Sequence, residues 1–188
     1  MHSDPAKARR ARPVTKEWLE RAALHYLGRY SATRSRLVEV LIRKVRRRHE
    51  DDAPPSTEEA GWVEAVADRC VELGYVDDAA YARARAATLL RKGKPGRAIA
   101  ADLRHRGIGE EGVAGALETI DTDEGASLDR RAAAALARRR RFGAFGTGKE
   151  QSDDRRRKEL GAMMRGGFSY SLATEILDMD EDALRELL

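Results

Sequence analysis

The tripeptides Arg106-Gly107-Ile108 and Gly166-Gly167-Phe168 lie about sixty residues apart, and each ends one helical stretch and opens the next. An apolar residue stands four positions before the central glycine of each tripeptide, and another follows it directly. This pattern predicts a Schellman motif, in which glycine takes a left-handed conformation and the flanking apolar side chains touch across the turn. The recurrence of this stop signal predicts a repeated helical unit.

The composition favours helix throughout the chain. Alanine, arginine, leucine and glutamate dominate the 188 residues, and runs of valine, isoleucine and threonine are missing. Hydrophobic residues make up 41% of the chain and charged residues 36%, which predicts a thin core with much solvated surface. We therefore expect an all-α protein of three tandem three-helix repeats that form an extended, curved array.

Cap signals and apolar stripes set the expected boundaries. Thr15 can cap a first helix, Ser56 with Glu59 forms a capping box, and Pro95 suits the first position of a later helix. The expected parts are a disordered basic arm (residues 1–13), three-helix repeats (14–75, 76–121 and 122–179) and a C-terminal helical cap (180–188). The similarity between repeats is clear for the second and third and weak for the first.

The charges are unevenly distributed. The net charge is only +4, but basic residues concentrate in two blocks, and acidic stretches lie over residues 50–78 and 175–186. This alternation predicts basic surfaces for a polyanion and acidic patches for a protein partner, with plain solvated helix faces as the alternative. The expected DNA or filament contacts are Arg43, Arg46, Arg47, Lys94, Arg97, Arg138, Arg139, Arg140, Arg141, Arg155, Arg156 and Arg157. Such contacts to phosphates would give affinity without sequence preference.

The sequence contains one motif that resembles a nucleotide site. Gly143 to Lys149 has the G-x-x-x-x-G-K spacing of a P-loop, but Glu150 stands where that loop needs a hydroxyl for magnesium. The motif also follows an Ala/Arg-rich helix instead of a buried strand. We therefore favour a flexible inter-helix loop; an approach to a DNA backbone and a nucleotide-dependent enzyme are the other interpretations.

Other chemistry is also not expected. The four histidines lack metal-ligand spacing, and no carboxylate pair lies in an apolar setting that would suit acid–base catalysis. The single cysteine, Cys70, lies on an apolar helix face and excludes an internal disulfide, which fits a reducing cytoplasm. No apolar run approaches the length that crosses a bilayer. We expect no enzyme, no metal and no cofactor.

The most specific segment is Gly74 to Ala82, with the sequence GYVDDAAYA. It precedes Lys92-Gly93-Lys94-Pro95 and the stop at Arg106-Gly107-Ile108. These motifs resemble the signature of the RecX family of recombinase regulators, and the resemblance covers about Trp18 to Leu177. It assigns structural roles to Gly74, Tyr75, Asp77, Asp78, Tyr81, Gly93, Gly107, Ile108, Gly167 and Phe168. The match at Gly167 and Phe168 departs from the family pattern, because Gly166 stands where the family usually has an arginine.

The resemblance implies a cytoplasmic bacterial protein that binds the RecA recombinase and lodges in the groove of its filament on DNA. It implies modulation, mostly inhibition, of the ATPase and strand-exchange activities of RecA in recombination, DNA repair and the SOS response. It carries over no catalytic residues. We expect a monomer that contacts RecA and single- or double-stranded DNA, without a membrane. A nucleic-acid-binding helical repeat with no dedicated recombinase partner is the alternative.

Overall fold

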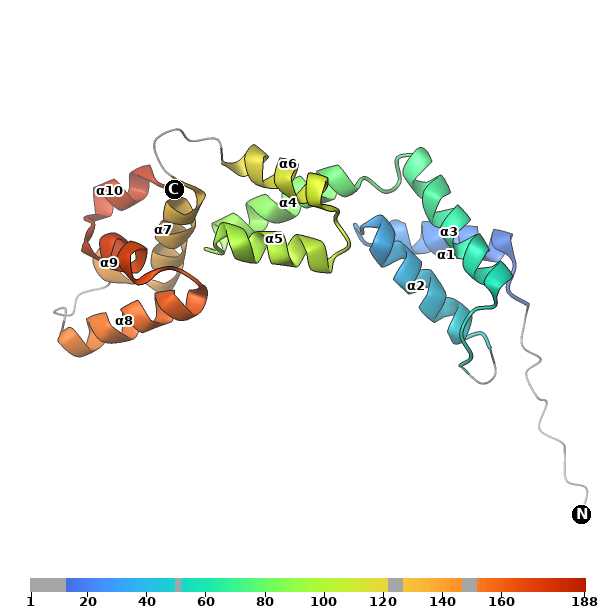
Figure 1. The fold of residues 1–188 in the computed structure, drawn as a ribbon, viewed down its shortest axis with the longest axis horizontal. Helices are drawn as coiled ribbons and strands as arrows, with labels where there is room; N and C mark the ends of the chain where they lie inside the picture. The colour runs from blue at the N-terminus through green and yellow to red at the C-terminus, as the bar shows by residue number, and fades with distance from the viewer. Residues whose placement is uncertain (1–12, 50–51, 122–126, 147–151) are drawn as a thin grey trace, which may run out of the picture. The chain divides into compact units, whose positions relative to one another are not determined.

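The computed structural model describes residues 13–49, 52–121, 127–146 and 152–188 (Figure 1). These residues form ten α-helices and one 3-10 turn, with no strand among them, which confirms the expected all-α fold. Apart from Pro13, the expected basic arm lies outside the described residues. The helices group into two compact units that divide between Asp77 and Asp78, and each unit is described by itself.

Unit 1 contains three helices. They are α1 (Lys16–Leu27), α2 (Arg34–Arg46) and α3 (Thr57–Glu72). The hydroxyl of Thr15 caps α1 by accepting from the amide of Trp18, and Ser56 and Glu59 form the expected capping box at the start of α3. The buried apolar core consists of Leu19, Ala23, Leu37, Leu41, Val45, Val63, Val66, Ala67, Cys70 and Val76. Each large side chain buried here contributes roughly 1.5–3 kcal/mol to stability.

Unit 2 contains the remaining helices around one continuous apolar core. They are α4 (Asp78–Arg91), α5 (Gly96–His105), α6 (Glu110–Ile120), α7 (Leu128–Arg140), the 3-10 turn η1 (Gly143–Phe145), α8 (Asp153–Gly166), α9 (Tyr170–Asp178) and α10 (Glu181–Glu186). Helix α7 is central: it packs against α4, α5 and α9, and residues 132–137 are all buried. Its alanines let neighbouring helices approach closely. The expected division of the chain into repeats over residues 14–75, 76–121 and 122–179, with a cap over 180–188, stays a prediction.

The two stop signals form the hydrogen bonds expected of Schellman motifs. The amide of Ile108 donates to the carbonyl of Leu103 at 3.1 Å, and the amide of Gly107 donates to the carbonyl of Arg104 at 2.9 Å. Gly107 has φ +78°, and Gly167 in the second stop has φ +105°. The prediction that glycine takes the left-handed position is therefore confirmed at both sites.

Helix α7 ends in the same way without a glycine. Arg141 has φ +59°, and the amide of Phe142 donates to the carbonyl of Ala137 at 2.9 Å. A non-glycine residue in this conformation costs on the order of 1 kcal/mol. The glycine loop that begins at Gly143 predicts that this helix ends near Arg141, but arginine has no preference for the left-handed conformation that it takes here.

The structure bears on two local predictions, the position of Pro95 and the glycine loop. Pro95 is the residue before α5, with ψ 156°, so its prediction as the first helical residue was wrong by one position. Pro95 has no side-chain acceptor, and a carboxylate oxygen of Asp129 on α7 instead accepts from the amide of Gly96 at 2.8 Å. Part of the expected glycine loop forms the turn η1, whereas Gly148 and Lys149 lie outside the described residues.

Candidate nucleic-acid interface

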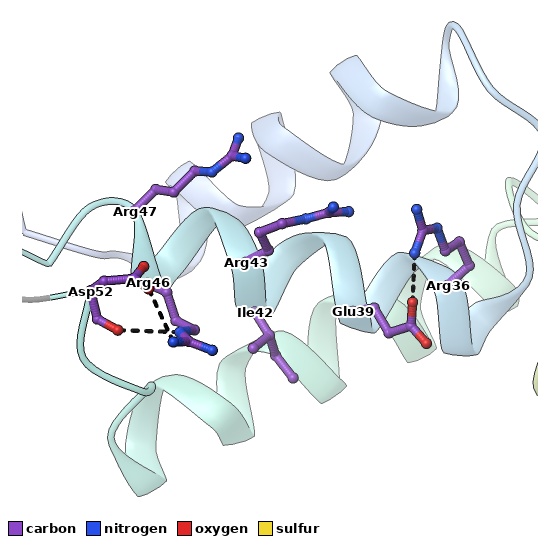
Figure 2. Close-up of a pocket in the computed structure, with 7 residues that line it drawn as sticks. All are labelled: Arg36, Glu39, Ile42, Arg43, Arg46, Arg47 and Asp52. Carbon is purple, nitrogen blue, oxygen red and sulfur yellow. Dashed lines mark hydrogen bonds and ion pairs between the residues drawn. The ribbon is translucent and has the colours of Figure 1, made fainter.

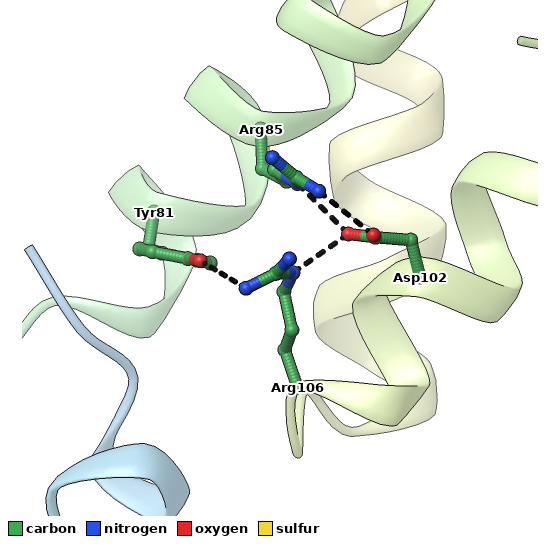
Figure 3. Close-up of polar contacts among 4 residues, drawn as sticks. All are labelled: Tyr81, Arg85, Asp102 and Arg106. Carbon is green, nitrogen blue, oxygen red and sulfur yellow. Dashed lines mark hydrogen bonds and ion pairs between the residues drawn. The ribbon is translucent and has the colours of Figure 1, made fainter.

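A polar network joins α4 to α5 at the signature tyrosine (Figure 3). Arg85 donates two hydrogen bonds to Asp102, at 2.9 and 2.8 Å. Arg106 donates to Asp102 at 2.8 Å and to the hydroxyl of Tyr81 at 3.0 Å. The bonds from Arg85, and then those from Arg106, hold the pKa of the Asp102 carboxyl well below its usual range. Asp102 is thus a fixed anion that orients two helices, and it is unsuited to proton transfer.

Four cations of unit 2 converge on one hollow, which we call the cationic pocket. Its volume is about 290 Å³. Its lining consists of Gly93, Lys94, Leu136, Arg139, Arg140, Phe142, Ala162, Arg165 and Gly166. The structure thereby brings together three of the predicted contacts, Lys94, Arg139 and Arg140, and it adds Arg165. No acidic side chain is among the lining residues.

Two glycine turns build this pocket against α7. Gly93 is buried at φ +72°, and a Cβ placed on it would lie 2.6 Å from the backbone of Leu136. This close approach sets Lys94 beside the last turn of α7. A Cβ on Gly166 would lie 3.2 Å from a methyl group of Leu136, so the C-terminal end of α8 also packs on this residue. Arg165, adjacent in sequence to Gly166, is therefore placed by tertiary packing, and no sequence pattern pointed to it.

A second basic cluster lies on α2 of unit 1, around an open hollow of about 530 Å³ (Figure 2). Within it Arg46 pairs with Asp52 at 3.0 Å. Arg43 and Arg47 extend in the same direction and form no ion pair with any residue that the structure describes. These two arginines are therefore available to an anionic partner, whereas the Arg46 charge is already matched.

Arg155, a predicted phosphate contact, holds part of unit 2 together. It donates to Glu159 at 2.7 Å. Glu159 is only 8% exposed, and it also accepts from the amide of Gly143 at 3.0 Å, which fixes the turn η1 to α8. A buried carboxylate requires this pairing, since an unpaired one costs several kcal/mol. Pairing with Glu159 thus gives the charge of Arg155 a structural role that needs no ligand.

Two further predicted contacts have partners within unit 2. Arg156 pairs with Asp178 at 2.6 Å, and Arg97 donates to the carbonyl of Gly167 at 2.7 Å. The remaining ones, Arg138, Arg141 and Arg157, are exposed. Proximity in sequence therefore does not separate arginines that bridge helices from arginines that face solvent.

Among residues 13–49, 52–121, 127–146 and 152–188, no three histidine, cysteine, aspartate or glutamate side chains group as potential metal ligands, and none of the helices could span a membrane. Cys70 is buried, and burial raises the pKa of its thiol, which disfavours the reactive thiolate.

Comparisons with known proteins identify the family. Residues 77–117 match the family model described as RecX, second three-helix domain. The chain is 38% identical over 170 residues to the regulatory protein RecX of Myxococcus xanthus (strain DK1622), covering 90% of this chain and 89% of that protein. It is 29% identical over 175 residues to that of Agrobacterium fabrum (strain C58 / ATCC 33970), covering 91% and 88%.

A solved structure shows the same fold. The crystal structure of RecX from Lactobacillus salivarius matches with a TM-score of 0.57 at 22% identity, covering 87% of this chain and 96% of that one. The chain therefore belongs to the RecX family of regulatory proteins.

Proposed function

We propose that this chain binds the RecA recombinase filament on DNA and modulates, mostly by inhibition, the ATPase and strand-exchange activities of RecA. The observation that carries this proposal is the 38% identity to a regulatory RecX protein over 90% of the chain. Regulatory proteins of this family are not enzymes, so the effect arises from binding. Because RecA acts on the bacterial chromosome, a chain that binds it works in the cytoplasm.

The basic surfaces support DNA as part of the target. Arg43 and Arg47 of unit 1 and the four cations of the cationic pocket form no ion pair with a carboxylate of the described residues; Glu39 and Asp52 beside Arg43 and Arg47 pair with Arg36 and Arg46 instead. Lysine and arginine contacts to phosphates bind any sequence and weaken steeply as salt rises. A filament of protein on DNA offers such phosphates together with a specific protein surface.

The regulatory effect follows from unequal binding to filament states. A bound protein changes an equilibrium only to the extent that it binds one state more tightly than another. Inhibition of the RecA ATPase therefore requires that this chain bind a less active or shortened filament more tightly than the active one. A monomer is sufficient for this role, and light scattering of the purified protein tests the monomeric state.

A pull-down separates a RecA partner from DNA binding alone. The tagged chain is mixed with RecA and single-stranded DNA and recovered with and without nuclease treatment. Retention of RecA after complete digestion of the DNA supports the proposal, because contact with the protein then persists. Loss of all RecA on digestion, with DNA binding intact, instead favours a sequence-independent nucleic-acid-binding repeat without a dedicated recombinase partner.

A further inference from the structure

The cationic pocket lies where three helices of unit 2 end. Helix α4 ends at Arg91, just before Gly93 and Lys94; α7 ends at Arg140, and α8 ends at Gly166. The carbonyl end of a helix carries a partial charge of about −0.5. Three such ends amount to about −1.5, which offsets less than half of the four positive side chains on the pocket lining. The pocket therefore keeps an excess of positive charge.

This excess has no internal counter-charge in the described part of the chain. Lys94, Arg139, Arg140 and Arg165 form no ion pair there, whereas Arg85, Arg106, Arg155 and Arg156 of the same unit are all paired with carboxylates. Four like charges around one hollow repel one another, and an anion inside the hollow relieves that repulsion. The arrangement thus fits an anionic ligand.

We propose that the cationic pocket seats one backbone phosphate of a single DNA strand. The proposal rests on the proposed function and deepens it, since it assigns a DNA contact to a defined place. Arginine guanidinium groups match phosphate oxygens with paired N–H donors, and Lys94 adds a point charge. Leu136, Phe142 and Ala162 supply an apolar wall for the attached sugar or base.

The apolar wall of the pocket favours a strand over a duplex. The volume of about 290 Å³ is close to the small end of ligand pockets, which span roughly 300–1,000 Å³, and a phosphate with its sugar is of this scale. A duplex also exposes phosphates, but its bases are paired and stacked inside, so only a single strand can bring a base against Leu136, Phe142 and Ala162. The packing of Gly93 and Gly166 on Leu136 fixes the turn that carries Lys94 and the end of α8 that carries Arg165, so little backbone freedom is lost on binding.

Fluorescence anisotropy with a labelled 12-residue oligothymidylate tests the proposal on the full chain. Arg165→Gln is expected to weaken binding about tenfold near 0.1 M salt, and to reduce the slope of log K against log salt by about 0.7, the value for one phosphate of a single strand. Arg139→Gln is expected to act similarly. The double variant should lose little more slope than either single variant, because both side chains serve one phosphate.

Arg83→Gln is the control. Arg83 is exposed on α4 of the same unit, carries the same charge, does not line the pocket and is not among the expected DNA contacts. We expect its substitution to change the affinity less than twofold. An equal loss of affinity for Arg83→Gln and Arg165→Gln would mean that diffuse charge binds DNA, and it would overturn the assignment of a phosphate to the pocket. Unchanged melting temperatures of the variants exclude misfolding as the cause of any loss.

Two further outcomes separate this inference from the proposed function. Unchanged oligothymidylate binding by Arg165→Gln and Arg139→Gln overturns the assignment of a phosphate to the pocket. Recovery of RecA with the tagged chain after nuclease treatment would still support the proposed function in that case. A 12-residue polyglutamate that binds as tightly as the oligonucleotide, and loses affinity equally with Arg165→Gln, would assign the pocket to an acidic protein segment instead. Weak polyglutamate binding supports the phosphate assignment.

Discussion

A Cβ atom on Gly93 would lie 2.6 Å from the Cα, N and Cβ atoms of Leu136, so the turn between α4 and α5 rests directly on the backbone of α7. Backbone atoms of a central helix cannot move aside as the end of a flexible side chain can. The contact makes glycine necessary at residue 93 for a reason of packing, in addition to its positive φ of 72°. It also fixes where Lys94 meets the arginines of α7.

Substitution of Gly93 by alanine should therefore be severe. We expect Gly93→Ala to lower the free energy of unfolding by about 4 kcal/mol, since it combines overpacking with a strained backbone. Gly74→Ala is the matched control: Gly74 has φ +73°, but an added Cβ meets no atom within 4 Å. It should cost only about 1 kcal/mol. Equal losses in urea unfolding would show that the contact with Leu136 does not matter.

The Asp102 network should stabilise the α4–α5 pair. Asp102→Asn keeps the shape but removes the charge that two arginines share, and we expect a loss of about 2 kcal/mol in thermal or urea unfolding. Tyr81→Phe removes only one hydrogen bond, from Arg106, and should cost about 1 kcal/mol. A smaller loss for Asp102→Asn than for Tyr81→Phe would contradict the central place of this carboxylate.

His49 should make the stability of unit 1 depend on pH. Its ring nitrogens lie 3.0 Å from a carboxylate oxygen of Glu59 and 3.0 Å from the carbonyl of Ala53, and both partners accept hydrogen bonds. The Glu59 carboxylate, and then the Ala53 carbonyl, raise the pKa of His49. Because the folded pKa is raised, this contribution is complete below the unfolded value of about 6.5 and is lost as pH rises through the folded pKa.

Urea titrations at a series of pH values measure this dependence. We expect the free energy of unfolding of the wild-type chain to fall between about pH 6 and pH 8, and His49→Gln to flatten that fall. A wild-type profile that rises over this range, or one that His49→Gln leaves unaltered, is the result that excludes the effect.

Arg155 and Arg157 should differ in how much each contributes to the stability of the fold. Arg155→Gln leaves the nearly buried Glu159 without its partner and should destabilise the chain by about 2 kcal/mol. Arg157→Gln, on an exposed position of the same helix, should change stability by less than about 0.5 kcal/mol. Thermal unfolding of the two variants checks this difference, and the reverse order would restore Arg155 as a solvent-facing phosphate contact.

More of the fold than of the site could be predicted from the sequence. Local rules act on neighbouring residues, so the cap at Ser56 and the stops at Gly107 and Gly167 could be predicted and are confirmed. The position of Pro95 was wrong by one residue because its helix borrows an acceptor from Asp129, which is distant in sequence. The end of α7 near Arg141 could be predicted from the glycine loop that begins at Gly143, whereas the left-handed conformation of Arg141 could not.

The predicted contacts illustrate the limit for the site. Charge clustering selected Arg155 and Arg139 on equal grounds, yet packing pairs the first with Glu159 and places the second on the cationic pocket. Arg165 joins the pocket because α8 ends against Leu136, a tertiary relation without a local signal. Sequence patterns therefore identify basic surfaces, whereas only packing tells which arginines are free to bind.

The most direct test of the central claim is the steady-state ATPase rate of RecA on single-stranded DNA with this chain titrated in. The account predicts a progressive fall in rate that is complete near or below one chain per RecA monomer, and a weaker effect at high salt. An ATPase rate that stays unchanged at stoichiometric amounts of folded protein would contradict it.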